Sequence, residues 1–347
     1  QQTPTHQYDK VGLMTISKIK DFEKLTAAAE AALADCDVKT LQGGLAPDEQ
    51  PQYELYHNVG SVCAQKVRCV LAELAVPYVS HDIPIVQEPW PTYQPDYVKL
   101  RVAGSRGQDF VSGHTGSSSA SQHGFDPTVV PTFIDRGAEN IVIDSQRICR
   151  YIDSQIGQSA LRPAALAAAI DEQTAIVDDI PNIALAFGTH PGVDPRPQNI
   201  RKYADGGMPR KIEALKKVRE IYSSDETIVR AVDAKMVKEQ AALDFLNDAH
   251  FMSGVLARTA DCIATLEGTL DSETTDWLCS DSYTMADLFW GINLYRLKAL
   301  GMGYLWDPEA YPHERAVYRP HVRAYAERLA ERPSFRHAVA DWGVAFN

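Results

Sequence analysis

Hydrophobic and polar positions follow two different rhythms along this chain, one in each half. In the first half, short apolar runs typical of strands alternate with stretches of helical period. Strands are expected at 53–57, 78–83, 132–135 and 141–143, and helices at 63–74 and from 95 to about 100. A further helix is expected from 145 to about 156, with Ser145 as its N-cap. This order predicts an α/β sandwich of about 100 residues.

Strand signals vanish after residue 163, and stripes of helical spacing take over. Helices are expected at 229–246, 255–266, 285–300, 318–329 and 333–342. Ser223 and Glu226 have the spacing of a helix capping box, and so do Thr284 and Asp287. Gly268 is expected to break the second of these helices. The second half is therefore predicted to be an all-helical domain.

Two segments stand outside this pattern. Residues 1–50 precede the first strand signal, and 16–34 among them predict a helix that lies on another domain. Residues 102–127 are rich in Gly and Ser and predict a loop, with His114 and His123 in it, that acts as a lid over a site. The predicted domains are 1–50, 51–157 with this insertion, and 163–347.

Composition narrows the class of protein. The 347 residues carry a net charge of −12, which argues against nucleic acid or an anionic membrane as the main partner. The six cysteines show no CxxC pair, no metal-binding spacing and no disulfide framework, so a reduced, cytoplasmic location is expected. No apolar run reaches the roughly 18 residues of a membrane span, and no signal peptide is visible at the start.

Cys63 has the most informative setting of any residue in the chain. It lies where a strand turns into a helix, and helix N–H groups there favour an anion, so we expect a lowered thiol pKa. Ser61 is placed to donate a hydrogen bond to a thiolate. From position alone, a buried and inert cysteine is an equally good interpretation. Lys66 is left open between the thiolate and solvent, and Arg68 is expected in solvent. Two further cysteines are expected to be inert core residues, Cys69 and Cys149.

Four motifs occur in an order that resembles the glutathione transferase superfamily over residues 53–345. They are the SVCAQKVR turn at 61–68, Val129-Val-Pro-Thr132, Asp144-Ser145 and Thr284-Met-Ala-Asp287. Within that superfamily, the S-x-C-x-x-K pattern resembles glutathione-dependent reductive dehalogenases that act on chlorinated hydroquinones. The resemblance implies a thioredoxin-like α/β domain followed by an all-α domain, with an N-terminal helical extension.

The resemblance also implies roles for particular residues. Val130 and Pro131 match the cis-proline pair beside the thiol, where the Val130 backbone pairs with the cysteinyl part of glutathione. Asp144 and Ser145 match the positions that hold its γ-glutamyl end, and helix N–H groups near Ser145 suit a carboxylate. Side chains expected near the aromatic substrate are Phe187, Arg196, Tyr203 and Trp290.

The expected activity is glutathione-dependent reductive dehalogenation through a disulfide between Cys63 and glutathione. The implied cosubstrate is glutathione, the implied partner is a small halogenated hydroquinone, and a homodimer is possible. Two rivals stay open. One is a glutathione transferase that cleaves aryl ethers or isomerises maleyl compounds, and the other is a non-enzymatic interaction domain of the same fold.

Overall fold

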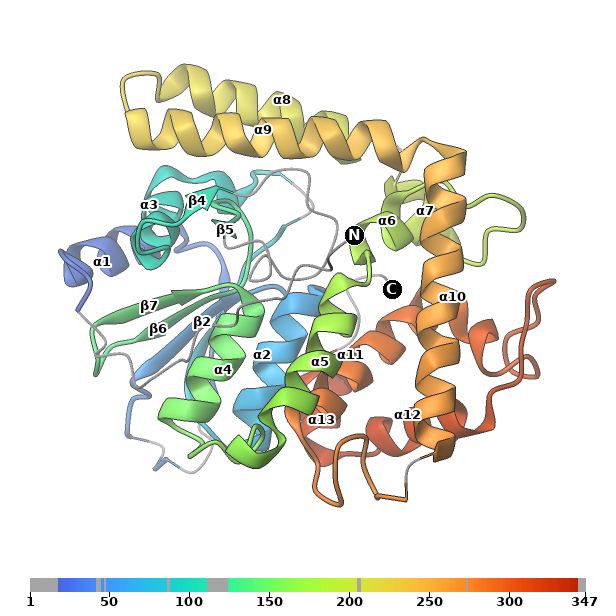
Figure 1. Ribbon diagram of the computed structural model, residues 1–347. Coiled ribbons are helices and arrows are strands. Elements are labelled where there is room, and N and C mark those ends of the chain that lie inside the picture. Colours follow the sequence, from blue (N-terminus) through green and yellow to red (C-terminus); the bar gives the residue numbers. More distant parts are fainter. Residues whose placement is uncertain are drawn as a thin grey trace, which may run out of the picture.

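A computed structural model describes most of the chain. The described residues are 18–41, 45–46, 48–85, 88–110, 124–204, 207–272 and 274–342. The sandwich lies at one side of the molecule and the helical domain at the other, with helix α2 between them (Figure 1).

A five-stranded mixed sheet forms the centre of the first domain. Its order is β1-β3-β2-β6-β7, and only β2 and β3 run parallel. The strands are β1 Asp37–Leu41, β2 Tyr53–His57, β3 Tyr78–Asp82, β6 Thr132–Asp135 and β7 Asn140–Ile143. The helices around it are α2 Val62–Glu73, η1 Pro91–Tyr93, α3 Pro95–Gly104 and α4 Ser145–Gln155. This is the thioredoxin-like arrangement that the resemblance implied.

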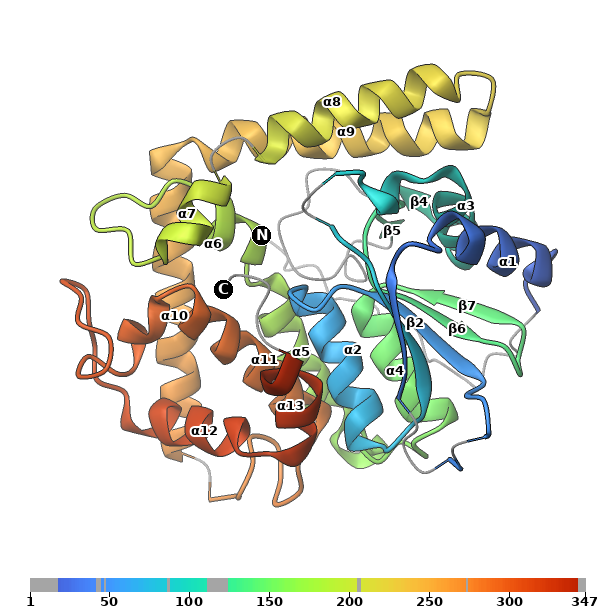
Figure 2. The ribbon, with the colours of Figure 1, turned by 180° about the vertical axis from the view of Figure 1, so that it is seen from behind.

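Alternation along the strands sends side chains to two separate cores. Leu55 and Phe133 belong to the core shared with α2, α4 and the helical domain, while Tyr56 and Ile134 belong to a second core on the other face. The second core is covered by α1 Phe22–Ala32 and α3, which lie side by side (Figures 1 and 2). Both faces of the sheet are thus buried.

The N-terminal extension contributes a strand that the sequence pattern missed. β1 pairs antiparallel with β3, with Asp37 opposite Asp82 and Leu41 opposite Tyr78. Four of its five side chains are exposed. A strand held at a sheet edge by backbone hydrogen bonds needs no apolar alternation, so its side chains carried no signal. The expectation that the extension is a helix alone was therefore incomplete.

The insertion is more ordered at its ends than a loop. α3 continues to Gly104, and a two-residue strand β4, Asp109–Phe110, pairs in parallel with β5, Gly124–Phe125. Residues 111–123, which include both histidines of the insertion, lie outside the described residues. The loop expected over 102–127 is thus wrong at both edges.

The second domain is helical throughout its described residues. The α-helices are α5 Ala167–Asp179, α6 Asn182–Phe187, α7 Gln198–Ala204, α8 Gly207–Ile221, α9 Glu226–Leu246, α10 Ala249–Ser272, α11 Met285–Ala299, α12 Pro320–Ala330 and α13 Pro333–Ala338. Single 3₁₀ turns are η3 Ala164–Leu166, η4 Met302–Leu305 and η5 Ala340–Trp342. α8 and α9 form a hairpin that passes over α3 (Figures 1 and 2).

Helix ends tested the local sequence signals. The box at Thr284 and Asp287 is formed at the start of α11 and is fully buried there, so this prediction is confirmed. The box at Ser223 is wrong, because Asp225 caps α9 and accepts from the Ile228 N–H. Gly268 lies inside α10, where nothing lies within 4 Å of an added Cβ, and it does not break the helix.

Candidate active site

The turn from β2 to α2 presents Cys63 at a helix start. Ser61 is the N-cap of α2, and its hydroxyl oxygen accepts from the Ala64 N–H at 3.4 Å. Cys63 is the second residue of the helix and is partly exposed. The first N–H groups of a helix have no intrahelical partner, so they point at whatever lies before the helix. Local sequence chemistry placed this cysteine correctly.

A second helix start lies beside the first. Asp144 is the N-cap of α4, with φ 73°, and its carboxylate accepts from the N–H groups of Gln146 at 3.0 Å and Arg147 at 3.4 Å. Ser145 is therefore the first helical residue and not the cap, which corrects the expectation. Both side chains are nearly buried, with 7% of Asp144 and 2% of Ser145 exposed.

Ser145 and Cys63 meet although they are far apart in sequence. The Ser145 hydroxyl is hydrogen-bonded to the Cys63 thiol. Packing of α4 against α2 on one face of the sheet brings the two helix starts together (Figure 1). Two residues that sequence reasoning selected separately thus belong to one site.

The electrostatic surroundings of Cys63 differ from the expectation. Burial raises the pKa of the Cys63 thiol, and the carboxylates of Asp144 and Asp178 raise it further. Lys66 and the Ser145 hydroxyl act in the opposite direction, but the pKa stays above its ordinary value. The expected lowering by the helix start is therefore wrong for the protein without ligand. Desolvation outweighs the helix dipole here because the thiol lies between two domains.

Lys66 is a buried cation next to the thiol. Its side chain is fully buried, pairs with the Asp178 carboxylate of α5, and places its ammonium 4.7 Å from the centre of the Phe289 ring. Burial lowers the pKa of Lys66, yet Asp178 and Cys63 outweigh that effect and the pKa is raised. Lys66 is thus charged at neutral pH and directed to the site rather than to solvent.

Arg68 is buried as well, and the expectation that it faces solvent is wrong. None of its side chain is exposed, and its Nε donates to the Ala338 carbonyl at 2.9 Å. Its guanidinium also lies 4.6 Å from the Trp342 ring and contacts His57. Ala338 and Trp342 come from the C-terminal part of the chain, so no local pattern around residue 68 predicts these two contacts.

The segment before β6 has the form that the resemblance implied. The Val130–Pro131 peptide bond is cis. Tyr97 donates to the Val129 carbonyl at 2.9 Å, and Arg101 donates to the Pro131 carbonyl at 2.8 Å. The carbonyls on each side of Val130 are thereby held by side chains of α3.

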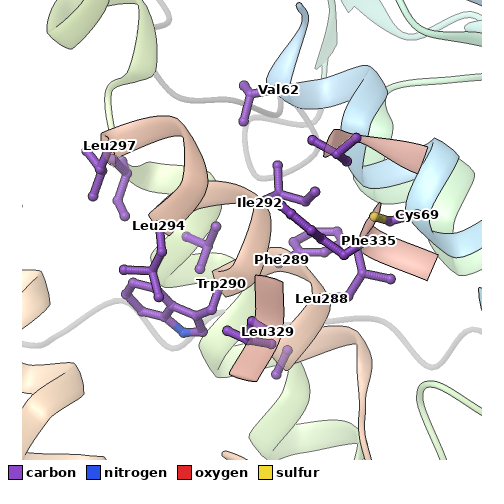
Figure 3. Packing of buried hydrophobic residues seen from close by; sticks show 14 of the residues in the cluster. Val62, Cys69, Leu288, Phe289, Trp290, Ile292, Leu294, Leu297, Leu329 and Phe335 are labelled. Carbon is purple, nitrogen blue, oxygen red and sulfur yellow. The ribbon is translucent and has the colours of Figure 1, made fainter. Parts of the chain in front are cut away.

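The four residues expected near the substrate lie in different surroundings in the structure. Arg196 is 6% exposed and is bound to Asp194 and to the Ala186 carbonyl, so it serves the helical domain itself. Trp290 is 1% exposed, donates to Gln173 and belongs to the core, as Figure 3 shows, rather than to a pocket wall. Phe187 ends α6 and packs partly buried against that core. Tyr203 lies on α7, and its side chain is outside the described part.

Sequence reasoning missed two charged residues at this site. Asp178 of α5 pairs with Lys66, and Arg296 of α11 faces Cys63. Burial lowers the pKa of Arg296 to about 10, and Cys63 acts in the opposite direction. An arginine between the apolar positions Leu294 and Leu297 was the available signal for Arg296. Asp178 gave no comparable signal, since its helix is ordinary in composition.

Metal chemistry finds no support in the described part of the chain, where no group of three His, Cys, Asp or Glu side chains is arranged to hold an ion. Among the same residues, no helix is both long and apolar enough to cross a bilayer. What the site offers is a thiol with one hydroxyl, two cations and two carboxylates around it.

Comparison with known proteins accords with this site. Residues 60–155 match the model of the glutathione S-transferase N-terminal domain. The 2,5-dichlorohydroquinone reductive dechlorinases of two Sphingobium indicum strains are each 36% identical over 296 residues, covering 84% of this chain and 84% of theirs. The chain belongs to the glutathione transferase superfamily. This glutathione transferase also shares its fold with a β-etherase from Sphingobium sp. strain SYK-6, with a TM-score of 0.51 at 16% identity, covering 83% of this chain and 98% of that one.

Proposed function

We propose that this glutathione transferase removes chlorine reductively from a chlorinated hydroquinone, with glutathione as reductant. The observation that supports it best is the thiol of Cys63, hydrogen-bonded to Ser145 and flanked by two buried cations. The 36% identity to dechlorinases of 2,5-dichlorohydroquinone supports the substrate class. A cytoplasmic location and a homodimer belong to the same proposal.

The proposed reaction proceeds in three steps. Glutathione thiolate adds to the tautomer of the chlorinated ring and chloride leaves, which forms a glutathionyl hydroquinone. Cys63 thiolate then attacks the glutathione sulfur, a disulfide forms, and the ring leaves with the electron pair of the carbon–sulfur bond and is protonated. A second glutathione exchanges with the disulfide and restores Cys63. One chloride and one oxidised glutathione result from each ring.

Glutathione itself is proposed to lie along three segments of the sandwich. The Val130 backbone pairs with its cysteinyl part, and Ser145 with the start of α4 receives the γ-glutamyl end. Asp144 already accepts two N–H groups of α4, so it serves the γ-glutamyl ammonium only with its remaining oxygen capacity. Ser61 supplies a hydroxyl next to the first thiolate.

Replacing Cys63 by Ser tests this proposal. We expect Cys63→Ser to consume hydroquinone and release chloride while a glutathionyl hydroquinone accumulates and the dechlorinated product is lost. Mass spectrometry of the reaction mixture measures both species. Cys262→Ser, which alters a partly exposed thiol on α10, is the matched control and should react like wild type. Normal release of dechlorinated product by Cys63→Ser would contradict the mechanism and favour ether cleavage or isomerisation.

A further inference from the structure

The C-terminal half of helix α11 buries two polar side chains among apolar neighbours. Asn293 has none of its side chain exposed, and Arg296 has 8% exposed. Their neighbours along the helix, among them Ile292, Leu294 and Leu297, are core residues. Burying an amide and a guanidinium in such surroundings costs free energy unless each meets a suitable group.

Asn293 has an unusual lack of partners. Neither its amide nitrogen nor its amide oxygen has a hydrogen-bond partner among the described residues. Each unpaired buried polar atom costs about 1–3 kcal/mol, so folding alone would favour a leucine here. An amide offers one donor group and one acceptor, which is the pair of contacts that a hydroxyl group makes.

Helical spacing places these two residues on the stripe that faces α2. Phe289, Asn293 and Arg296 are separated by four and three positions, so they follow one another along one face. Phe289 meets Lys66, and Arg296 faces Cys63, at the two ends of this stripe. Asn293 therefore lies between them.

The close view supports this orientation. Figure 3 shows Phe289 and Ile292 on the side of α11 toward Val62 and Cys69 of α2, and Trp290 on the other side. Burial lowers the pKa of Arg296 and Cys63 opposes this, and the resulting pKa of about 10 keeps the guanidinium charged at neutral pH. The stripe thus sets a cation at the reactive sulfur and an amide donor and acceptor about one helical turn from that cation.

We propose that Asn293 and Arg296 bind a ring oxygen of the aromatic substrate next to Cys63. This inference rests on the proposed dehalogenation and names the contacts that select its substrate. The Asn293 amide exchanges hydrogen bonds with a ring hydroxyl of the glutathionyl hydroquinone. That hydroxyl becomes a carbonyl when its proton moves to the ring carbon that bears sulfur. When Cys63 attacks the glutathione sulfur, the disulfide forms, the carbon–sulfur bond breaks, and its electron pair moves onto the carbonyl oxygen as an enolate, which a proton converts to the hydroquinone. Arg296 then stabilises the new charge, as preorganised donors do in a dry site.

Kinetics of three variants and one control test the contacts. Asn293→Leu and Arg296→Gln should lower kcat/KM for a chlorinated hydroquinone about 10- to 100-fold while the KM for glutathione stays at its wild-type value. For Arg296→Gln the loss should fall mainly on kcat, with partial recovery in Arg296→Lys. Lys298→Gln removes an exposed cation from the same helix and should behave like wild type.

Stability separates this role from a structural one. Because Asn293→Leu replaces an unpaired amide by an apolar group of similar size, its urea midpoint should equal or exceed that of wild type. Loss of activity with unchanged or higher stability supports the inference. If Asn293→Leu unfolds more easily, Asn293→Ser tests the same amide without added apolar volume, and wild-type kinetics in Asn293→Ser would overturn the inference.

Binding without turnover distinguishes this inference from the proposed function. Calorimetry with unchlorinated hydroquinone and with its dimethyl ether measures preference for a free hydroxyl. Wild type should prefer the hydroquinone, and Asn293→Leu should lose that preference. If wild type shows the preference but releases no chloride from any chlorinated hydroquinone, the proposed function fails and the oxygen subsite stands. If Asn293→Leu keeps the wild-type preference for hydroquinone over its dimethyl ether, the proposed oxygen subsite is wrong.

Discussion

Single residues set the reactivity of this site through opposing effects. Burial and two carboxylates raise the pKa of Cys63, while Lys66 and Ser145 lower it. The thiol is therefore mostly protonated at neutral pH in the protein without ligand, and the reaction depends on the groups that favour its thiolate. Cys69 lies deeper in the core, and burial raises its pKa to about 12 even though Arg68 acts in the opposite direction. A cysteine at a helix start is not reactive by position alone.

Ser145→Ala tests the hydroxyl at this site. Removing a hydrogen bond to a charged group costs about 1.5 kcal/mol, so the KM for glutathione should rise roughly tenfold. Because the hydroxyl lowers the pKa of Cys63, its loss should move iodoacetamide alkylation of Cys63 to higher pH. Ser154→Ala, which alters an exposed hydroxyl on the same helix, is the control. An unchanged KM together with an unchanged alkylation profile would remove Ser145 from the site.

Among the elements, the hairpin of α8 and α9 is held to the end of the 102–127 insertion by a cluster of buried ion pairs. Asp126 accepts from Lys235 at 2.8 Å and from Lys238 at 2.6 Å, and Lys235 also pairs with Glu239. Asp126 lies two residues after the start of β5 and four residues before Val130. The buried ion-pair cluster therefore also holds the segment that leads to Val130 in the site. Arg101 binds the Asp126 carbonyl as well.

Asp126→Asn should break the buried ion-pair cluster and strongly lower the free energy of unfolding. Breaking a buried pair leaves uncompensated charge and costs about 3–5 kcal/mol. Burial raises the pKa of Asp126, but the two lysines hold it well below its ordinary value. A lowered carboxyl pKa gives stability that is present above the unfolded value of about 3.9 and is lost as the pH falls through the folded value.

Urea unfolding between pH 7 and pH 3 measures both effects. Wild type should lose stability on acidification below about pH 4, and Asp126→Asn should start lower and fall less steeply. Asp233→Asn, which breaks an exposed pair with Arg219, should cost less than about 1 kcal/mol. Equal urea midpoints for Asp126→Asn and Asp233→Asn would show that the buried ion-pair cluster does not stabilise the fold more than an exposed pair does.

At the scale of the molecule, Arg68 joins the turn before Cys63 to the C-terminal helices of the other domain. Besides the Ala338 carbonyl, its guanidinium reaches the carbonyls of Asn58 and Val59 at 3.4 Å, in the turn that leads to Cys63. Helix α13 packs against α2 through this region (Figure 2). The position of the reactive turn thus depends on the last helices of the other domain.

Arg68→Met should therefore destabilise the whole protein. Charged hydrogen bonds are worth about 1.5–3 kcal/mol, and the buried carbonyls would lose their donor, so we expect a loss of about 2–4 kcal/mol in urea unfolding. Arg328→Met, which removes an exposed guanidinium 4.5 Å from the Trp277 ring, is the control and should cost about 0.5–1 kcal/mol. A wild-type urea midpoint for Arg68→Met would mean that other contacts hold the turn before Cys63 to helix α13.

Sequence by itself determined the features that depend on a few neighbouring residues. The strand and helix rhythm, the N-cap before Cys63 and the box at Thr284 were all predictable, because periodicity and capping are local. Asp144 and Ser145 were placed correctly at the start of a helix, although the cap was assigned to the wrong one of the two.

Tertiary structure alone decided the rest, because burial and charge at a residue depend on distant segments. Arg68 is buried only because the C-terminus covers it, and the pKa of Cys63 is raised because two domains enclose it. β1 exists because β3 offers a free edge, and Asn293 stands out only once its amide is known to be buried without a partner among the described residues. Such facts follow from the packing of elements and leave no pattern in the local sequence.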